Sequence, residues 1–298
     1  MVPWLAFGLL FPLMYAVSNI IDKLLLESRV KNIYSQALIG GACYLLFAAL
    51  VMAFHPLGSL PREGVLLALS TGLVLAISIL GYYRSMQMEE ITRVVPLLNL
   101  GPLFTAMFAY LMIGESLAPH FYLAIIAMVC GAVLLSVKTL KGMLRLSKAE
   151  GVILPTAALW GLMVVLDKVV LGYMSFWNLY ALQFLSYGAV IQLLLLSKRN
   201  RDAARHLVKD GTALFILASE VFAFFGYMLE MKSLSLTNVS FVSSFGVMIP
   251  LYVLVISTLL AVYLPKLHKE PHTLRQIAMK AVATLLIIAG ATVIGLGI

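Results

Sequence analysis

Acidic side chains inside long apolar runs are the residues of this chain that could do chemistry. Glu220 lies between Ala218-Ser219 and Val221-Phe222, near the middle of one such run. A carboxyl group at that depth is costly unless it finds a partner or water, and it can exchange a proton when its surroundings change. Glu220 is therefore a candidate for proton coupling. The alternative is a neutral carboxyl that hydrogen-bonds to a neighbouring helix.

The dipeptide Asp-Lys occurs twice, each time near the end of an apolar run. Asp22-Lys23 lie in the first run, and Asp167-Lys168 follow 145 residues later. Ionisable groups in such surroundings usually pair with another group or line a water-filled path. The alternative is that each lysine extends out of the apolar layer while the aspartate caps a neighbouring backbone. The role of the two pairs depends on where the helices place them.

The composition identifies the medium around these side chains. Apolar residues make up 62% of the chain and charged residues only 11%, too few charges for a water-facing surface. About ten apolar runs are each roughly 18 to 25 residues long, enough for a helix to cross a ~30 Å hydrocarbon layer. The sequence predicts an all-α integral membrane protein with ten transmembrane helices, at 4–26, 33–54, 65–86, 91–113, 121–138, 151–171, 177–197, 211–231, 239–264 and 274–298.

The two Asp-Lys pairs belong to an internal repeat. Further identities fall on the same offset, among them Leu26 with Leu171, Gly81-Tyr82 with Gly226-Tyr227, Thr92 with Thr237 and Gly101 with Gly246. We expect a first five-helix repeat in residues 1–145 and a second in residues 146–298. Five is an odd number, so the second copy must enter the membrane from the opposite side, which predicts two inverted repeats of the kind found in transporters.

Inversion places the two Asp-Lys pairs near opposite faces of the membrane. We interpret Asp22, Lys23, Asp167 and Lys168 as gating candidates whose carboxylates bond across to the other half. Lys168 is one of few basic residues toward its face, so a local partner or an anionic substrate is expected there.

A substrate cavity is expected near the midplane, between the repeats. Tyr15 and Trp160 coincide under the repeat offset, which suggests a pair of facing aromatic rings. The substrate-cavity candidates are Tyr15, Asn19, Asn99, Trp160, Gln183, Tyr227, Ser243 and Ser244. Any one of them could equally serve helix packing. Glycines and prolines predict bends in the fourth and ninth helices, at Pro96, Gly101, Pro102, Gly246 and Pro250.

Basic residues divide sharply between the loops. Of the 21 lysines and arginines, all except Arg62, Lys168 and Lys232 lie in or beside the odd-numbered loops. Because short cytoplasmic loops carry an excess of Lys and Arg, this bias places the odd loops in the cytoplasm and both termini outside. The net charge of +8 follows from this bias, and no basic stripe with interleaved aromatics suggests nucleic acid binding. We expect a multi-pass protein of the cell membrane.

A short pattern resembles a known family. The segment Thr92-Arg93-Val94-Val95-Pro96 through Gly101-Pro102, with Gly114-Glu115 closing the helix, is similar to the EamA branch of the drug/metabolite transporter superfamily. In the second half Gly246 and Pro250 are present, but no Gly-Glu follows. The resemblance implies a ten-helix inverted-repeat carrier of small metabolites such as amino acids, sugars or nucleotide derivatives. It also implies cytoplasmic termini, opposite to the charge bias.

Other classes fit the residues less well. An intramembrane aspartyl protease needs two adjacent carboxylates, whereas Asp22 and Asp167 are expected at opposite faces. Cys43 and Cys130 lie in apolar runs and suggest no metal site or disulfide, and the chain shows no phosphate-binding loop for ATP. We expect neither an enzyme nor a cofactor. The sequence favours a secondary active transporter of a small organic solute that works by alternating access, with proton coupling as a hypothesis. A facilitative channel or an exchanger without proton coupling is the alternative.

Overall fold

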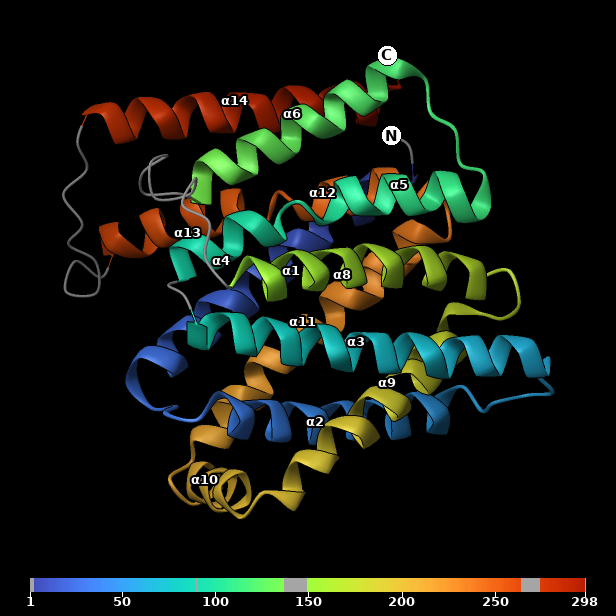
Figure 1. Cartoon of the computed structure of the whole chain (residues 1–298), viewed down its shortest axis with the longest axis vertical. Helices are drawn as coiled ribbons and strands as arrows, with labels where there is room; N and C mark the ends of the chain where they lie inside the picture. Colours follow the sequence, from blue (N-terminus) through green and yellow to red (C-terminus); the bar gives the residue numbers. More distant parts are fainter. Residues whose placement is uncertain (1–2, 89–90, 137–148, 264–273, 298) are drawn as a thin grey trace.

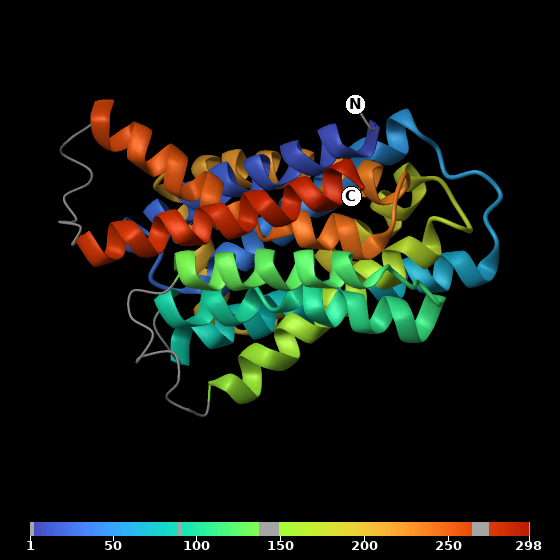
Figure 2. The ribbon, with the colours of Figure 1, turned by 90° about the horizontal axis from the view of Figure 1, so that it is seen from above.

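The chain folds into a bundle of membrane-crossing helices. A computed structural model describes residues 3–88, 91–136, 149–263 and 274–297. In Figure 1 the long helices run across the picture in one common direction, and Figure 2 shows the same after a quarter turn. Ten spans within these ranges are long and apolar enough to cross a membrane, which confirms the predicted fold class.

The first half contributes five spans. They are α1 (Pro3–Ser28), α2 (Ile33–Phe54), α3 (Arg62–Met88), the pair α4 (Ile91–Leu98) and α5 (Gly101–Ile113), and α6 (Pro119–Ser136). The second half follows the same plan, with α8 (Glu150–Val170), α9 (Phe176–Gln192), α11 (Thr212–Leu234), the pair α12 (Val239–Gly246) and α13 (Ile249–Tyr263), and α14 (Leu274–Leu296). The expected boundary between residues 145 and 146 lies outside the described residues.

Helix contacts repeat with two-fold symmetry. By order along the chain α1 corresponds to α8, α2 to α9, α3 to α11 and α6 to α14. The extensive contact of α1 with α11 is matched by that of α8 with α3, and the contact of α5 with α8 is matched by that of α13 with α1. The pairs α2–α9 and α6–α14 each join a helix to its own counterpart, so the two-fold axis passes between them. All these contacts cross from one half to the other, so the inverted repeats interlock.

The fourth and ninth spans are each broken into two helices. The first break falls at Asn99-Leu100 and the second at Val247-Met248. Pro96 lies inside α4 and Pro102 lies in the first turn of α5, and neither ring nitrogen can donate a helical hydrogen bond. The single continuous helices expected at 91–113 and 239–264 are therefore corrected to broken ones, at the places where the glycines and prolines predicted bends.

The polar segment after α9 is helical, although the sequence suggested only a break between spans. A short 3-10 turn, η1 (Leu193–Leu196), leads into α10 (Lys198–Lys209), which Figure 1 views almost end-on. The helix therefore lies across the direction of the spans. Asp210 follows it and accepts a hydrogen bond from the Thr212 backbone N–H over 2.9 Å, which holds the pKa of that carboxyl below its usual range.

Two glycines bring α6 and α14 into close contact. A Cβ at Gly131 would lie 2.7 Å from the Ala283 carbonyl oxygen, and one at Gly290 would lie 2.7 Å from that of Ala124. Backbone atoms cannot withdraw as a flexible side chain can. Small residues at both positions are therefore needed for this helix pair to form.

We predict that Gly131→Leu lowers the stability of the protein by about 1–3 kcal/mol, because the added side chain forces α6 away from α14. Thermal unfolding of the purified protein in detergent measures the effect. Gly151→Ala in the first turn of α8 is the matched control, since a Cβ there meets no atom within 4 Å. Equal melting temperatures for the two variants would contradict close packing at Gly131.

Candidate functional site

The Asp22 carboxylate joins three helices toward the odd-loop face. Its Oδ1 accepts hydrogen bonds from Gln36 Nε2 of α2 over 3.0 Å and from Ser219 Oγ of α11 over 2.7 Å. The Ser219 hydroxyl also lies 2.9 Å from that of Ser18, one helical turn before Asp22. The expected bond across to the other half is therefore present for Asp22, through Ser219.

Glu220 follows Ser219 on α11, and its carboxyl group points toward α2. A Cβ at Gly40 would lie only 2.5 Å from Glu220 Oε1, so the absence of a side chain at this position makes room for the carboxyl. Asp22 and Tyr44 lie within electrostatic range of Glu220. Tyr44 in turn contacts the rings of Phe184 and Tyr187 on α9. Glu220 thus lies among aromatic rings, with a second carboxyl group nearby.

Asp167 forms a closed ring of side chains toward the opposite face. Gln183 Nε2 donates to Asp167 Oδ1 over 3.0 Å, and Tyr227 Oη lies 2.9 Å from Asp167 Oδ2 and also contacts Gln183 Oε1. The single hydrogen of Tyr227 can serve only one of these two acceptors. Both contacts become hydrogen bonds when Asp167 carries a proton, because its own O–H then donates to Tyr227. The ring is therefore complete with a neutral Asp167.

Asp167 has partners in both halves of the chain. Gln183 lies on α9 and Tyr227 on α11, so both belong to the same half as Asp167. The Thr71 hydroxyl of α3 also lies within hydrogen-bond reach of this carboxyl, so the expected contact with the other half is present. Two cavity candidates, Gln183 and Tyr227, contact Asp167, and all three side chains are buried.

Glu230 is a fourth acidic group between the helices. Its Oε2 accepts a hydrogen bond of 2.8 Å from Tyr15 Oη on α1. Position along a helix gives depth, whereas the neighbouring helix decides whether a partner is available.

The four carboxyl groups form two layers along α11. Asp22 and Glu220 lie toward the odd-loop face, and Asp167 and Glu230 lie toward the even-loop face. Ten residues separate Glu220 from Glu230, which corresponds to about 15 Å of helix rise. Helix α11 therefore carries or contacts every member of both layers.

Oppositely charged side chains hold the turn between α11 and α12 at the even-loop face. Glu115, from the loop after α5, accepts hydrogen bonds from the backbone N–H groups of Val239 (2.8 Å) and Ser240 (3.0 Å) at the start of α12. Lys168 Nζ donates to the carbonyl oxygens of Leu234 (2.7 Å) and Thr237 (2.8 Å). An anion at a helix start and a cation at a helix end are both favourable. Lys168 thus has local partners, as its unusual position suggested.

The remaining candidates are distributed more widely. Asn99 donates to Ser136 Oγ over 3.2 Å, Ser243 lies 2.9 Å from Thr105 Oγ1, and Ser244 bonds to the carbonyl oxygen of Phe241 in its own helix. The Trp160 ring is tilted against Tyr82, and the Tyr15 ring packs edge-on against Phe11, so each has a different aromatic neighbour. The Asn19 and Lys23 side chains are exposed. Only Tyr15, Gln183 and Tyr227 join the carboxyl layers.

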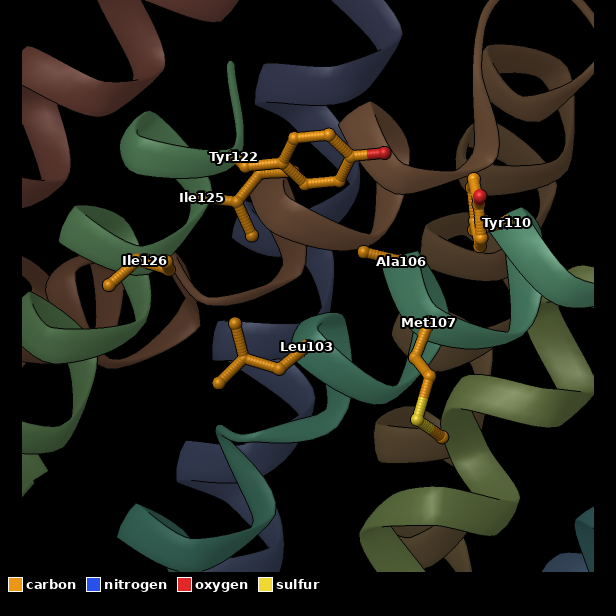
Figure 3. Close-up of a pocket in the computed structure, with 7 residues that line it drawn as sticks. All are labelled: Leu103, Ala106, Met107, Tyr110, Tyr122, Ile125 and Ile126. Atoms are coloured by element: carbon orange, nitrogen blue, oxygen red, sulfur yellow. The ribbon is translucent and has the colours of Figure 1, made fainter. Parts of the chain in front are cut away.

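An apolar pocket of about 310 Å³ lies between α5 and α6. Figure 3 shows Leu103, Met107 and Tyr110 of α5 facing Tyr122 and Ile126 of α6 across it. Several of these side chains are exposed, as expected for a surface covered by lipid. The pocket contains none of the candidate cavity residues. Among the described residues no cluster of three or more His, Cys, Asp or Glu side chains is placed to hold a metal ion.

Several residues of the two layers escaped the sequence analysis. Gln36 follows Asp22 by 14 residues as the candidate Gln183 follows Asp167 by 16, so the repeat itself could have indicated Gln36 as well. Ser18 and Ser219 carried no such signal, because serine is common between membrane helices. Glu115 was noted only as part of a family pattern, and its contact with α12 depends on the fold.

Comparison with known proteins decides the family. The model of the EamA-like transporter family matches residues 2–137 and again residues 148–296. The chain belongs to the EamA-like transporter family. This confirms the resemblance of the proline-rich fourth span and its Gly-Glu corner, and it makes the protein a membrane transporter built from two EamA repeats.

A solved structure shares the EamA fold of this chain. It is described as "Crystal structure of protein", is 16% identical, covers 99% of both chains and superimposes with a TM-score of 0.70. At that identity the likeness concerns the fold alone. No curated protein matches the chain.

We predict that Asp167→Ala destabilises the protein by about 1–3 kcal/mol, because Gln183 and Tyr227 lose a buried partner. Asp167→Asn should cost less than about 1 kcal/mol, since its amide can donate to Tyr227 and accept from Gln183 as a protonated carboxyl does. Thermal unfolding in detergent distinguishes the two. If Asp167→Asn is as destabilising as Asp167→Ala, the ring holds an ionised carboxylate.

Proposed function

We propose that the protein is a secondary active transporter that moves a small organic metabolite by alternating access and couples this movement to protons. The proposed substrate classes are amino acids, sugars and nucleotide derivatives. Neutral hydrogen-bonding groups and aromatic rings around the two carboxyl layers, such as Gln183, Tyr227 and Tyr44, suit solutes of this kind.

The observation that carries the proposal is the pair of carboxyl layers along α11. Their hydrogen-bond partners are amides and hydroxyls, and none of the ion pairs formed by the described Lys, Arg and His side chains involves Asp22, Asp167, Glu220 or Glu230. A carboxyl without a cation partner can take up or release a proton with little change in its neighbours. Layers near both faces would allow protons to enter from one side and leave toward the other.

Gating by the Asp-Lys pairs fits the same scheme. At the even-loop face Lys168 and Glu115 fix the turn between α11 and α12, so these contacts support a closed gate there. At the odd-loop face Asp22 joins α1 to α11 through Ser219, while Lys23 points to the exterior. Bends at the broken spans would move α12 and α4 when a gate opens. We retain Asn19, Asn99, Trp160, Ser243 and Ser244 as cavity candidates for the open states.

The charge bias supports an orientation. We propose that the odd-loop face lies in the cytoplasm of a cell whose plasma membrane holds the protein, with both termini outside. Figure 1 draws the two termini at the same end of the bundle, opposite α10 with its lysines and arginines. An epitope tag at either end, reached by antibody on intact cells, tests this orientation.

We predict that Glu220→Gln abolishes proton-driven accumulation, because the amide cannot release a proton. The measurement is uptake of a mixed metabolite pool into proteoliposomes, read by mass spectrometry with and without an imposed pH gradient. We expect accumulation by the unaltered protein only with the gradient, and a loss of accumulation of about 100-fold or more in the variant, the lower end of the range typical of a group that transfers a proton.

Leu75→Val is the matched control, since Leu75 is the repeat counterpart of Glu220 on α3 and titrates no proton. A flux that is the same with and without the gradient, and the same in Glu220→Gln, would contradict proton coupling. It would favour facilitated diffusion or exchange. Absence of flux for every solute in the pool, with folded protein, would contradict the proposed substrate classes.

We also predict that Glu115→Gln loosens the even-loop face, because a neutral amide accepts less strongly from the α12 N–H groups and cannot offset the charge of Lys168. Hydrogen bonds to charged groups contribute about 1.5–3 kcal/mol, so the open population should rise several-fold or more. Labelling of Ser243→Cys by a membrane-impermeant thiol reagent reports this opening. The exposed Glu63→Gln of α3, at the same face, is the control and should leave the labelling rate unchanged.

A further inference from the structure

A polar cavity of about 340 Å³ lies at the odd-loop end of the bundle, and none of the four carboxyl groups lines it. It forms where the turn between α1 and α2, the last turns of α3 and the start of α10 meet. Its walls include Lys31, Asn32, Arg84, Ser197, Arg199 and Asn200. Three separate segments of the chain thus each contribute a cation to one cavity.

Among the residues that the structure describes, these three cations have no ion-pair partner. The ion pairs of the described residues join Arg205 to Asp202 and His206 to Asp210, and none involves Lys31, Arg84 or Arg199. Like charges that share a cavity repel one another unless an anion lies between them. The cavity therefore has the charge of a site whose ligand is an anion.

The floor of the cavity is fixed by hydrogen bonds. Asn32 Nδ2 donates to Asn200 Oδ1 over 2.9 Å, and Asn32 Oδ1 accepts from the Tyr34 backbone N–H over 3.1 Å. Asn200 is only 9% exposed. These amides hold α10 against the start of α2, so the cations of both elements keep a defined spacing.

The surroundings of the cavity place it at the membrane interface. Leu193 and Leu196 of η1 are 62% and 85% exposed, directly before the cavity residues Ser197 and Arg199. Val208 of α10 is also exposed, at 61%. A polar helix that lies across the spans with exposed apolar side chains beside it is typical of an interfacial helix. Basic pockets between helices at this level suit phosphate-bearing headgroups.

We propose that this cavity binds the phosphate group of an anionic phospholipid, with Lys31, Arg84 and Arg199 around the phosphate and the leucines of η1 beside the acyl chains. The bound lipid would join α10 to the ends of α1 and α3. The site does not depend on the solute or on proton coupling. The lipid proposal can therefore be tested independently of the proposed transport function.

Native mass spectrometry of the full-length protein in neutral detergent tests the proposal. The probes are phosphatidylglycerol, phosphatidylcholine with the same acyl chains, and inorganic phosphate. We expect phosphatidylglycerol to bind more tightly than phosphatidylcholine. The triple variant Lys31→Gln/Arg84→Gln/Arg199→Gln should weaken this binding by about tenfold or more, since each cation near an anionic headgroup contributes severalfold.

The matched control is Lys198→Gln/Arg205→Gln/Lys209→Gln, which removes three charges from α10 outside the cavity. It should retain binding within about threefold, given the weaker attraction of charges more distant from the headgroup. Equal losses in the two triple variants would overturn the site in favour of general surface charge. Displacement of phosphatidylglycerol by millimolar inorganic phosphate would contradict the lipid as the ligand. The cavity would then be a binding site for dissolved phosphate. If the cavity variant fails to fold, Arg84→Gln and Arg199→Gln alone should each lower the affinity severalfold, and no loss in either would contradict the proposal.

Discussion

A carboxyl group between membrane helices depends on hydrogen-bond donors from the protein, because the hydrocarbon layer supplies none. In this transporter the donors come from helices other than the one that carries the acid. Asp22 of α1 relies on α2 and α11, Asp167 of α8 relies on α9 and α11, and Glu230 of α11 relies on α1. A shift of α11 would alter at least one contact of each of these three acids. Helix position and the protonation of the acids are therefore linked by the same hydrogen bonds.

The scaffold is symmetric, but the chemistry is not. The contacts of α1, α2, α5 and α6 are mirrored by those of their counterparts, yet α11 carries two acids for which α3 has none at the equivalent positions. Glu220 corresponds to Leu75 and Glu230 to Ser85, whose hydroxyl bonds to the Gly81 carbonyl oxygen of its own helix. The repeat supplies two similar five-helix halves, and under the proposed proton coupling only the second half would contribute Glu220 and Glu230.

The sequence predicted the ten spans, the two repeats and the bends, because helix length, internal identity and proline chemistry are local properties. It placed Asp22 and Asp167 toward opposite faces for the same reason. The partners of these acids were out of reach, since Ser219 is 197 residues from Asp22 and no periodicity connects them. The orientation of α10 was also missed, because a polar segment of twelve residues resembles a loop until its neighbours are known. Glu230 shows the same limit, because its partner Tyr15 lies 215 residues away in the sequence.

Interlocked halves have a consequence for biosynthesis. The principal neighbours of α1, α2, α3, α5 and α6 all lie in the second half, so the first five spans leave the ribosome before the surfaces that cover them exist. In the nascent chain Asp22 is synthesised before its partner Ser219, and Glu115 is synthesised before the start of α12. Until then lipid, water at the bilayer surface or an insertion chaperone has to occupy those places. The interval is longest for Asp22, because Ser219 is translated 197 residues after it.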